Sequence, residues 1–190
     1  MSEWKEYILS DIAEVQTGPF GSQLKNEQYI IGGTPVVTVE HIVDFRIIDF
    51  NYPSVTSEDK NRLSKYLLRK GDIVFTRVGS VDLSAWVKPH QDGWMFSSRM
   101  LRVRVKQGTD SRFISYFFQQ KSFRDHILKI SVGATMPSIN TKILESISLF
   151  LPPLPEQRAI AAILSSLDDK IDLLRRQNAT LEALAETLFR

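Results

Sequence analysis

The stretch that decides the fold is LPPLPEQRAI at residues 151–160, which is followed by a helix-forming run to the end of the chain. Three prolines close together predict a rigid hinge over 151–155. Pro155 suits the first turn of a new helix, because its missing N–H would find no partner there. The sequence therefore predicts a globular domain over 1–150, this hinge, and one long helix over 156–190.

Apolar residues of the final segment recur at alternating steps of four and three, the spacing of a coiled-coil seam. The seam positions are Ile160, Leu164, Leu167, Ile171, Leu174, Asn178, Leu181, Ala185 and Leu188. A single polar Asn in such a seam fixes register. We expect the helix to pair with another helix; the alternative is a helix packed on its own domain. No closing signal precedes the last residue. This pattern indicates either one half of a longer protein or a short form that pairs with another copy.

The first 150 residues are expected to form a mixed α+β fold with a twisted, mostly antiparallel or mixed sheet. A short helix is predicted at 11–16, between Ser10 and Gly18, and a longer one at 111–129, capped by Asp110. Its aromatic cluster, Phe113, Ile114, Phe117 and Phe118, is expected in the core. The strand-like runs are 34–39, 47–50, 72–78, 84–88 and 99–106, and their spacing suggests a meander.

Composition excludes several functional classes. With 190 residues and 43% hydrophobic content, the chain can bury a core. The absence of Cys excludes disulfides and thiolate chemistry, and three scattered His argue against a metal centre. No signal peptide or membrane-spanning run is present, so we expect a cytoplasmic protein without membrane contact. No phosphate-binding glycine loop, nucleophile elbow or HExxH motif occurs, and catalysis by this chain is not expected.

Charge is distributed unevenly along the chain. The net charge is only +2, but residues 1–59 hold 3 basic and 10 acidic side chains, whereas 60–129 hold 15 basic and 5 acidic ones. Clustered cations are typical of proteins that bind DNA, because phosphate contacts release condensed counterions. The alternative is that the acidic first third folds against the basic middle and cancels its charge.

The candidate DNA contacts lie in one strand and three loops. In the strand at 99–106, a two-residue period puts Arg102, Arg104 and Lys106 on one face, where they can follow a phosphate backbone or simply face solvent. Arg99 begins the apolar face and must either pair or reach outward. The loops at 18–25, 76–84 and 131–137 combine Gly with polar groups that can read base edges, although tight turns would look the same. The candidates are Gln23, Lys25, Arg77, Ser80, Asp82, Ser98, Arg99, Arg102, Arg104 and Thr135.

These residues resemble a known family, the DNA-specificity (S) subunits of type I restriction-modification systems. The resemblance covers almost the whole chain. Its strongest parts are the opening from Trp4 to Gly21, the strand from Gly71 to Arg77, the Gly133 loop with Ile139-Asn140, and above all the hinge from Leu151 to Ile160 leading into the helix that ends Leu184-Ala185-Glu186-Thr187-Leu188-Phe189-Arg190.

The resemblance implies one target recognition domain, which reads half of a split DNA site, and one spacer helix. Family members usually carry this unit twice, and their two helices form an antiparallel ruler. A homodimer through the helix would imply a palindromic split site. The family also implies methyltransferase (M) subunits as partners and, through them, restriction (R) subunits. S-adenosylmethionine, ATP and Mg²⁺ would belong to those partners, with no cofactor on this chain.

The dimensions of the helix agree with this role, because 35 residues at about 1.5 Å each span on the order of 50 Å. One turn of B-DNA is about 34 Å. The competing interpretation is a homodimerising coiled-coil module that binds a protein partner and has no DNA specificity. Steeply salt-dependent binding to random duplex would favour DNA recognition.

Overall fold

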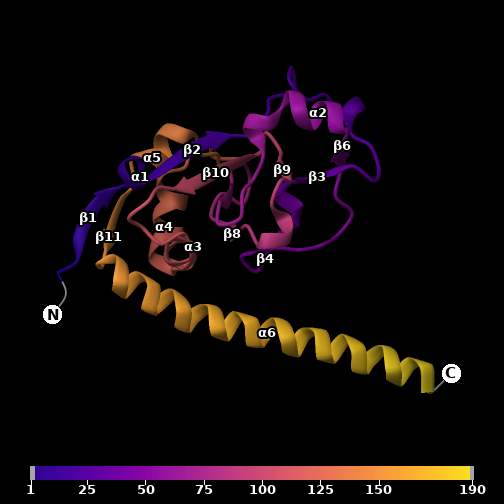
Figure 1. Ribbon diagram of the computed structural model, residues 1–190. Coiled ribbons are helices and arrows are strands. Elements are labelled where there is room, and N and C mark those ends of the chain that lie inside the picture. Colours follow the sequence, from indigo (N-terminus) through magenta and orange to yellow (C-terminus); the bar gives the residue numbers. More distant parts are fainter. Residues whose placement is uncertain (1–2, 189–190) are drawn as a thin grey trace.

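A four-stranded antiparallel sheet forms the centre of the structure, a computed structural model that describes residues 3–188 (Figure 1). In spatial order its strands are β2 (Ala13–Thr17), β10 (Met100–Val105), β7 (Ile73–Thr76) and β8 (Ser84–Trp86). β7 is rich in β-branched and aromatic residues, and all four of its side chains are buried. The sheet is therefore covered on both faces.

Helices cover one face of this sheet. They are α3 (Ser111–Gln119), α4 (Lys121–Ile130) and α5 (Thr141–Glu145). Phe75 of β7 packs edge-on against Phe118 and Phe123, with ring centroids 5.7 and 6.3 Å apart. The Asp110 cap is confirmed, because its carboxylate accepts a hydrogen bond from Phe113 N at 2.9 Å. The cluster predicted for the core is confirmed as well, with Phe117 only partly buried.

The single helix predicted at 111–129 is wrong. It is broken at Gln120, which is extended. Residues five apart lie about 140° apart on an unbroken helix, so Phe118 and Phe123 could not share a face. The break lets the two rings stack with centroids 4.7 Å apart.

A second layer covers the opposite face of the central sheet. It contains a small sheet in the order β6 (Ser54–Val55), β3 (Thr34–Val37), β9 (Met95–Phe96) and a hairpin of β4 (Ile42–Val43) and β5 (Arg46–Ile47). The two-residue hairpin turn, Asp44 and Phe45, has positive φ at both positions. Val74, Ala85 and Met100 of the central sheet belong to this second core. The layer also holds α2 (Ser57–Arg62) and short 3₁₀ turns at Asn26–Gln28, Val39–His41, Ser64–Tyr66 and Pro89–Gln91.

The two ends of the globular part are paired. β1 (Lys5–Ile8) runs antiparallel to β11 (Ser148–Leu151), and α1 (Leu9–Ile12) links β1 to β2. The helix predicted at 11–16 is therefore wrong. Residues 13–17 pair with β10 instead, because Ala13 and Val15 alternate with polar residues and pack one face on the core.

The predicted strands have mixed outcomes. The runs at 34–39, 72–78, 84–88 and 99–106 each contain a strand, whereas 47–50 contains only Ile47 of β5. The meander is also wrong, because β10 is inserted between β2 and β7.

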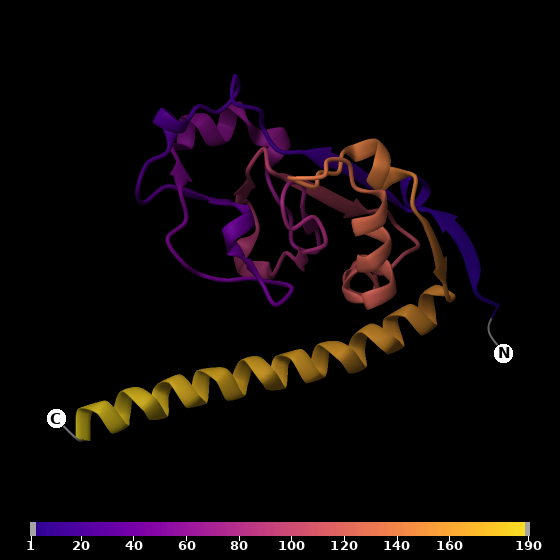
Figure 2. The same cartoon turned by 180° about the vertical axis from the view of Figure 1, so that it is seen from behind.

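The long helix α6 (Leu154–Leu188) lies along one side of both layers (Figures 1 and 2). It begins two residues earlier than predicted, so Pro155 lies in its first turn and Leu151 still belongs to β11. The last two residues of the predicted helix, 189–190, lie outside the described residues. The division of the chain into domain, hinge and helix stays a prediction. Within residues 3–188, no helix combines the length and apolar character needed to cross a membrane.

Candidate nucleic-acid interface

Four segments meet at one end of the central sheet, where β2 and β7 end and β8 and β10 begin. We call residues 18–25, 77–83, 97–99 and 131–138 the loop cluster. Backbone hydrogen bonds join its segments: Arg77 N donates to Arg99 O at 3.0 Å, and Gly79 N donates to Pro137 O at 2.9 Å. The antiparallel order of the strands thus brings together loops that are far apart in the sequence.

Two glycines of the loop cluster are required by geometry. A Cβ on Gly18 would lie 2.1 Å from Ser97 O, so only glycine allows this close approach of the two loops. Gly133 has a φ of +105°, and a Cβ there would lie 2.7 Å from Met136 O. The Gly residues therefore shape the surface of the loop cluster.

Arg77 links three segments of the loop cluster. Its Nη1 donates to Ser98 O at 3.2 Å, and its guanidinium lies 5.5 Å from the centroid of the Phe20 ring. Its backbone O accepts from Ile139 N. Its Nε is buried and has no hydrogen-bond partner among the described residues. Arg77 thus orders the neighbouring loops, and base reading by its guanidinium stays a prediction.

The exposed members of the loop cluster differ in chemistry. Lys25, Ser80, Arg99 and Thr135 are exposed. The side chain of Arg99 makes no hydrogen bond or ion pair with any described residue, so of the two options left open by the sequence it takes the outward one. Two further side chains, Phe20 and Met136, are 49% and 56% exposed.

Sequence reasoning missed both of these side chains. Contiguous exposed apolar patches are a feature of binding surfaces, whereas single exposed apolar side chains are common. The signal available in the sequence was their position beside glycines in the loops at 18–25 and 131–137.

Two predicted contacts have partners within the domain. Gln23 Oε1 accepts a hydrogen bond from the Tyr66 hydroxyl at 2.6 Å. Asp82 accepts from Arg124 Nε at 2.9 Å and forms an ion pair with the same guanidinium. Their side chains are held in place, and a DNA contact by either one stays a prediction.

The expected exposure of the basic face is wrong for Arg102 and Arg104, whereas Lys106 is exposed. Arg102 is 5% exposed, and its Nη1 donates to Lys65 O at 3.1 Å and Leu67 O at 3.2 Å. The reason is the second layer, which covers the face of β10 that carries Arg102. Burial and the nearby charge of Arg104 lower the pKa of Arg102. A buried guanidinium cannot follow a phosphate backbone.

The other two cations of this strand are also occupied. Arg104 forms a bidentate pair with the buried Asp72, with Nε–Oδ1 and Nη2–Oδ2 distances of 2.8 and 2.7 Å. This hydrogen bond raises the pKa of Arg104. Lys106 Nζ donates to Ser10 O at 2.7 Å and Asp11 O at 3.2 Å. All three cations thus make hydrogen bonds within the domain. The candidates that still face outward are Ser98, Arg99 and the loops.

The seam of α6 is divided between two environments. Ile160 and Leu164 are half-buried, and Ile160 packs against the core of its own domain. From Leu167 onward the predicted seam positions are exposed: Leu167, Ile171, Leu174, Asn178, Leu181 and Leu188. Most of the predicted seam is thus available to another helix.

Comparison with known proteins identifies the family of this chain. A sequence profile described as the type I restriction modification DNA specificity domain matches residues 1–183. The chain belongs to that family. This specificity domain is 26% identical over 190 residues to the type I restriction enzyme MjaIX specificity subunit of Methanocaldococcus jannaschii, covering 99% of the chain and 43% of the relative. It is 25% identical to the HindI specificity subunit of Haemophilus influenzae, covering 100% and 40%.

Solved structures share the fold of the specificity domain. The HsdS subunit from Thermoanaerobacter tengcongensis matches with a TM-score of 0.65 and 17% identity, over 91% of this chain and 39% of that one. A chain from "Structural basis underlying complex assembly and conformational transition of the type I R-M system" has a TM-score of 0.68 and 19% identity, over 97% and 43%. The fold class, mixed α+β followed by a long helix, is therefore confirmed. The specificity domain spans less than half the length of these proteins.

Proposed function

We propose that this chain is the non-catalytic, sequence-reading subunit of a type I restriction-modification complex, and that its loop cluster reads one half of a bipartite DNA target. The observation that carries the proposal is the gathering of four loops around Arg77, with the unpaired Arg99 facing outward, in a chain of the specificity family. An Arg with free donors suits bidentate binding to guanine, and exposed Lys25 and Thr135 suit phosphate contacts.

The long helix supports the second half of the proposal. Its exposed seam from Leu167 to Leu188 fits a second copy or a sibling half-subunit, and the pair would hold two loop clusters apart. A homodimer related by a twofold axis predicts a palindromic split site. The assembly would present both clusters to one side of the duplex.

The remaining partners follow from the family. The pair would recruit methyltransferase subunits and, through them, the restriction subunit. S-adenosylmethionine, ATP and Mg²⁺ would be bound by those subunits, and the complex would act in the cytoplasm, where the DNA is. The relatives with similar sequences are named specificity subunits of restriction enzymes, which supports this assignment of roles.

Methylome mapping tests the proposal. Cells that express this chain with its methyltransferase should carry one split methylated motif with two symmetric half-sites, and cells with the methyltransferase alone should lack it. A continuous motif, or none in both strains, would contradict the proposal. Absence of duplex binding at low salt by the methyltransferase-bound chain would favour a coiled-coil module without DNA specificity.

A further inference from the structure

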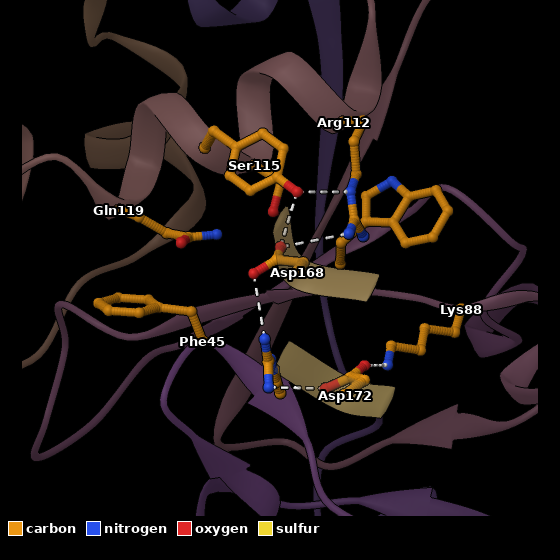
Figure 3. Close-up of a pocket in the computed structure, with 10 residues that line it drawn as sticks. Phe45, Lys88, Arg112, Ser115, Gln119, Asp168 and Asp172 are labelled. Atoms are coloured by element: carbon orange, nitrogen blue, oxygen red, sulfur yellow. Dashed lines mark hydrogen bonds and ion pairs between the residues drawn. The ribbon is translucent and has the colours of Figure 1, made fainter. Parts of the chain in front are cut away.

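The first half of α6 is attached to the globular domain in two different ways. Near its start, Gln157 and Ala161 are buried against the domain. Farther along, the contacts become ionic, because Asp168 and Asp172, one turn apart, face a small pocket between α3 and the β4–β5 hairpin (Figure 3). The exposed Asp169 lies between them and makes no such contact among the described residues.

Asp168 binds side chains from two elements of the domain. Its Oδ1 accepts from Arg46 Nη2 of β5 at 3.0 Å. Its Oδ2 accepts from the Tyr116 hydroxyl at 2.7 Å and from Arg112 Nη2 at 3.4 Å, both on α3. Burial, followed by the hydrogen bond to Asp168, raises the pKa of Tyr116 to about 12. The phenol therefore keeps its proton and remains a donor near neutral pH.

Asp172 continues the same arrangement one turn later. Lys88 Nζ donates to its Oδ2 at 2.7 Å. Arg46 Nη1 lies 2.7 Å from its Oδ1 and forms an ion pair there. Arg46 thus bridges the two carboxylates; Figure 3 labels Asp168 and Asp172 beside the pocket. The side chains of Arg46 and Asp172 are only 17% and 18% exposed, so solvent screens this pair less than a surface pair.

The cations of the domain are themselves held in place. The guanidinium of Arg112 lies 4.5 Å from the ring centroid of Trp86. Trp86 Nε1 in turn donates to Ser111 Oγ at 3.2 Å. Arg46 follows the tight turn of the β4–β5 hairpin. The side chains of the domain that bind the two carboxylates are therefore themselves fixed by neighbouring elements.

Asp168 and Asp172 lie on a different face of α6 from the apolar seam. At about 100° per residue, Asp168 and Asp172 lie on average roughly a third of a turn from Leu167, Ile171 and Leu174. Those three side chains remain 57%, 42% and 46% exposed. One stretch of helix can therefore hold its own domain and a second helix at the same time.

Small changes in the angle of this helix have large effects at its end. From Ala161, the last residue buried against the domain, to Leu188 the helix spans about 40 Å at about 1.5 Å per residue. A tilt of about 5° moves the far end by roughly 3.5 Å, which is about the 3.4 Å rise of one base pair.

We propose that Asp168 and Asp172, held by Arg46, Arg112 and Lys88, form a carboxylate clamp that fixes the angle between the recognition domain and the spacer helix and thereby selects the number of base pairs between the half-sites. Clamp residues are positioning residues that touch no base. The part of the inference that concerns DNA rests on the proposed function.

The distance between two nitroxide spin labels, measured by double electron–electron resonance, tests the clamp without DNA. Because the chain has no Cys, Ser57→Cys on α2 and Ala183→Cys on α6 supply the only two labels, and dilution with unlabelled chain isolates distances within one copy. The doubly labelled chain with Asp168 and Asp172 intact should give one narrow distance distribution. Asp168→Asn with Asp172→Asn should broaden it, whereas the matched control Asp169→Asn should leave it narrow. A narrow, unchanged distance in the double variant overturns the proposal.

A single substitution distinguishes loss of the clamp from misfolding of the domain. Lys88→Met removes one partner at a partly exposed position and should broaden the distance distribution less than the double variant, with an unchanged circular dichroism spectrum. An unchanged distribution in both folded variants would contradict the clamp.

DNA selection tests the consequence. From a pool with the half-sites found by methylome mapping and a randomised spacer length, the parent complex should retain one length. The clamp double variant should retain several lengths with the same half-sites. A single unchanged length, or altered half-sites, overturns the inference. If the parent itself selects no split site, the proposed function fails, while the distance measurement still decides the clamp.

Discussion

Arg99 and Arg102 are three residues apart in the sequence and have opposite environments. Arg99 lies in the turn before β10 with its side chain exposed and unpaired among the described residues. Arg102 lies inside β10, buried, and donates to two backbone carbonyls. A charged group stays buried only when it is paired or hydrogen-bonded, so the two arginines should respond to mutation in different ways.

On the proposed function, Arg99→Ala should weaken discrimination at one base pair of the target by about 1–3 kcal/mol, the range expected for loss of a bidentate contact to a base edge. Competition fluorescence anisotropy with single-base variants of the mapped site measures this. Arg69→Ala is the control, since Arg69 is exposed at the opposite end of β7. Equal discrimination by the Arg99 variant and its parent would show that Arg99 does not read a base.

Arg102→Ala should lower the free energy of unfolding by about 2–4 kcal/mol, since the hydrogen bonds of a buried guanidinium to Lys65 O and Leu67 O are lost and its side-chain packing with them. Urea denaturation measures the change. Arg99→Ala should change the same quantity by less than about 0.5 kcal/mol, as expected for a surface substitution. Equal stability of the two variants would argue against a structural role for Arg102.

The longest element is α6, and two of its faces have different environments. The face with Asp168 and Asp172 holds its own domain, and the face with Leu167, Ile171 and Leu174 is exposed. The two alternatives considered for this helix, pairing with another helix and packing on its own domain, are therefore compatible. From Leu167 onward the domain contact of α6 uses polar groups, which leaves this part of the apolar seam exposed.

If the seam pairs two copies as proposed, Leu174→Asp should convert that dimer to a monomer, because it places a charge in the seam. The matched control is Leu173→Asp. Leu173 is 52% exposed and lies about 100° from Leu174 around the helix axis, outside the seam. Size-exclusion chromatography with light scattering gives the masses. Dimers of the Leu174 variant, or monomers of the Leu173 variant only, would show that another surface mediates association.

Acid should release α6 from the domain only at low pH. Burial alone would raise the pKa of Asp172, but the hydrogen bond from Lys88 and the charges of Lys88, Arg46 and Arg175 outweigh it, and the pKa is lowered. A lowered pKa stabilises docking above the ordinary carboxyl range, and this stabilisation is lost as pH falls through the folded-state pKa.

The Ser57–Ala183 label distance should therefore stay narrow from about pH 8 to about pH 5 and broaden below about pH 4. Broadening that begins well above the ordinary carboxyl range would argue against Asp172 as the group that controls release. Asp172→Asn should remove most of the acid transition.

At the scale of the whole molecule, few ion pairs join the acidic first third to the basic middle. Among residues 3–188, the only ion-pair contacts between 1–59 and 60–129 are Asp59 with Arg62 and Asp49 with His90. Arg104 and Arg124 pair within the middle segment, and Lys88 pairs with α6. The acidic side chains of the first third therefore remain mostly outside such pairs.

Deleting residues 173–179, one heptad, should change the spacer and leave each half-site as it is. The seam keeps its register, and the helix shortens by about 10 Å, or roughly three base pairs. Selection of bound sequences from a random pool gives both quantities. Altered half-sites would show that the helix takes part in base reading.

The sequence alone was sufficient for the features that depend on local spacing. The long helix and its seam follow from the four-three repeat after Pro155, and the Asp110 cap and the aromatic core follow from nearest-neighbour helix geometry. The Gly-containing loops were recognised because φ and close approach restrict the residue at each position.

Only the tertiary structure decided which charged side chains face outward. A two-residue period tells which side chains share a face of a strand, and it cannot tell that a second layer covers that face, as it covers Arg102. The break at Gln120 and the pairing of Asp168 with Arg46, 122 residues away, depend in the same way on long-range packing. Such contacts are set by where distant segments meet, and no local pattern in this chain carries that information.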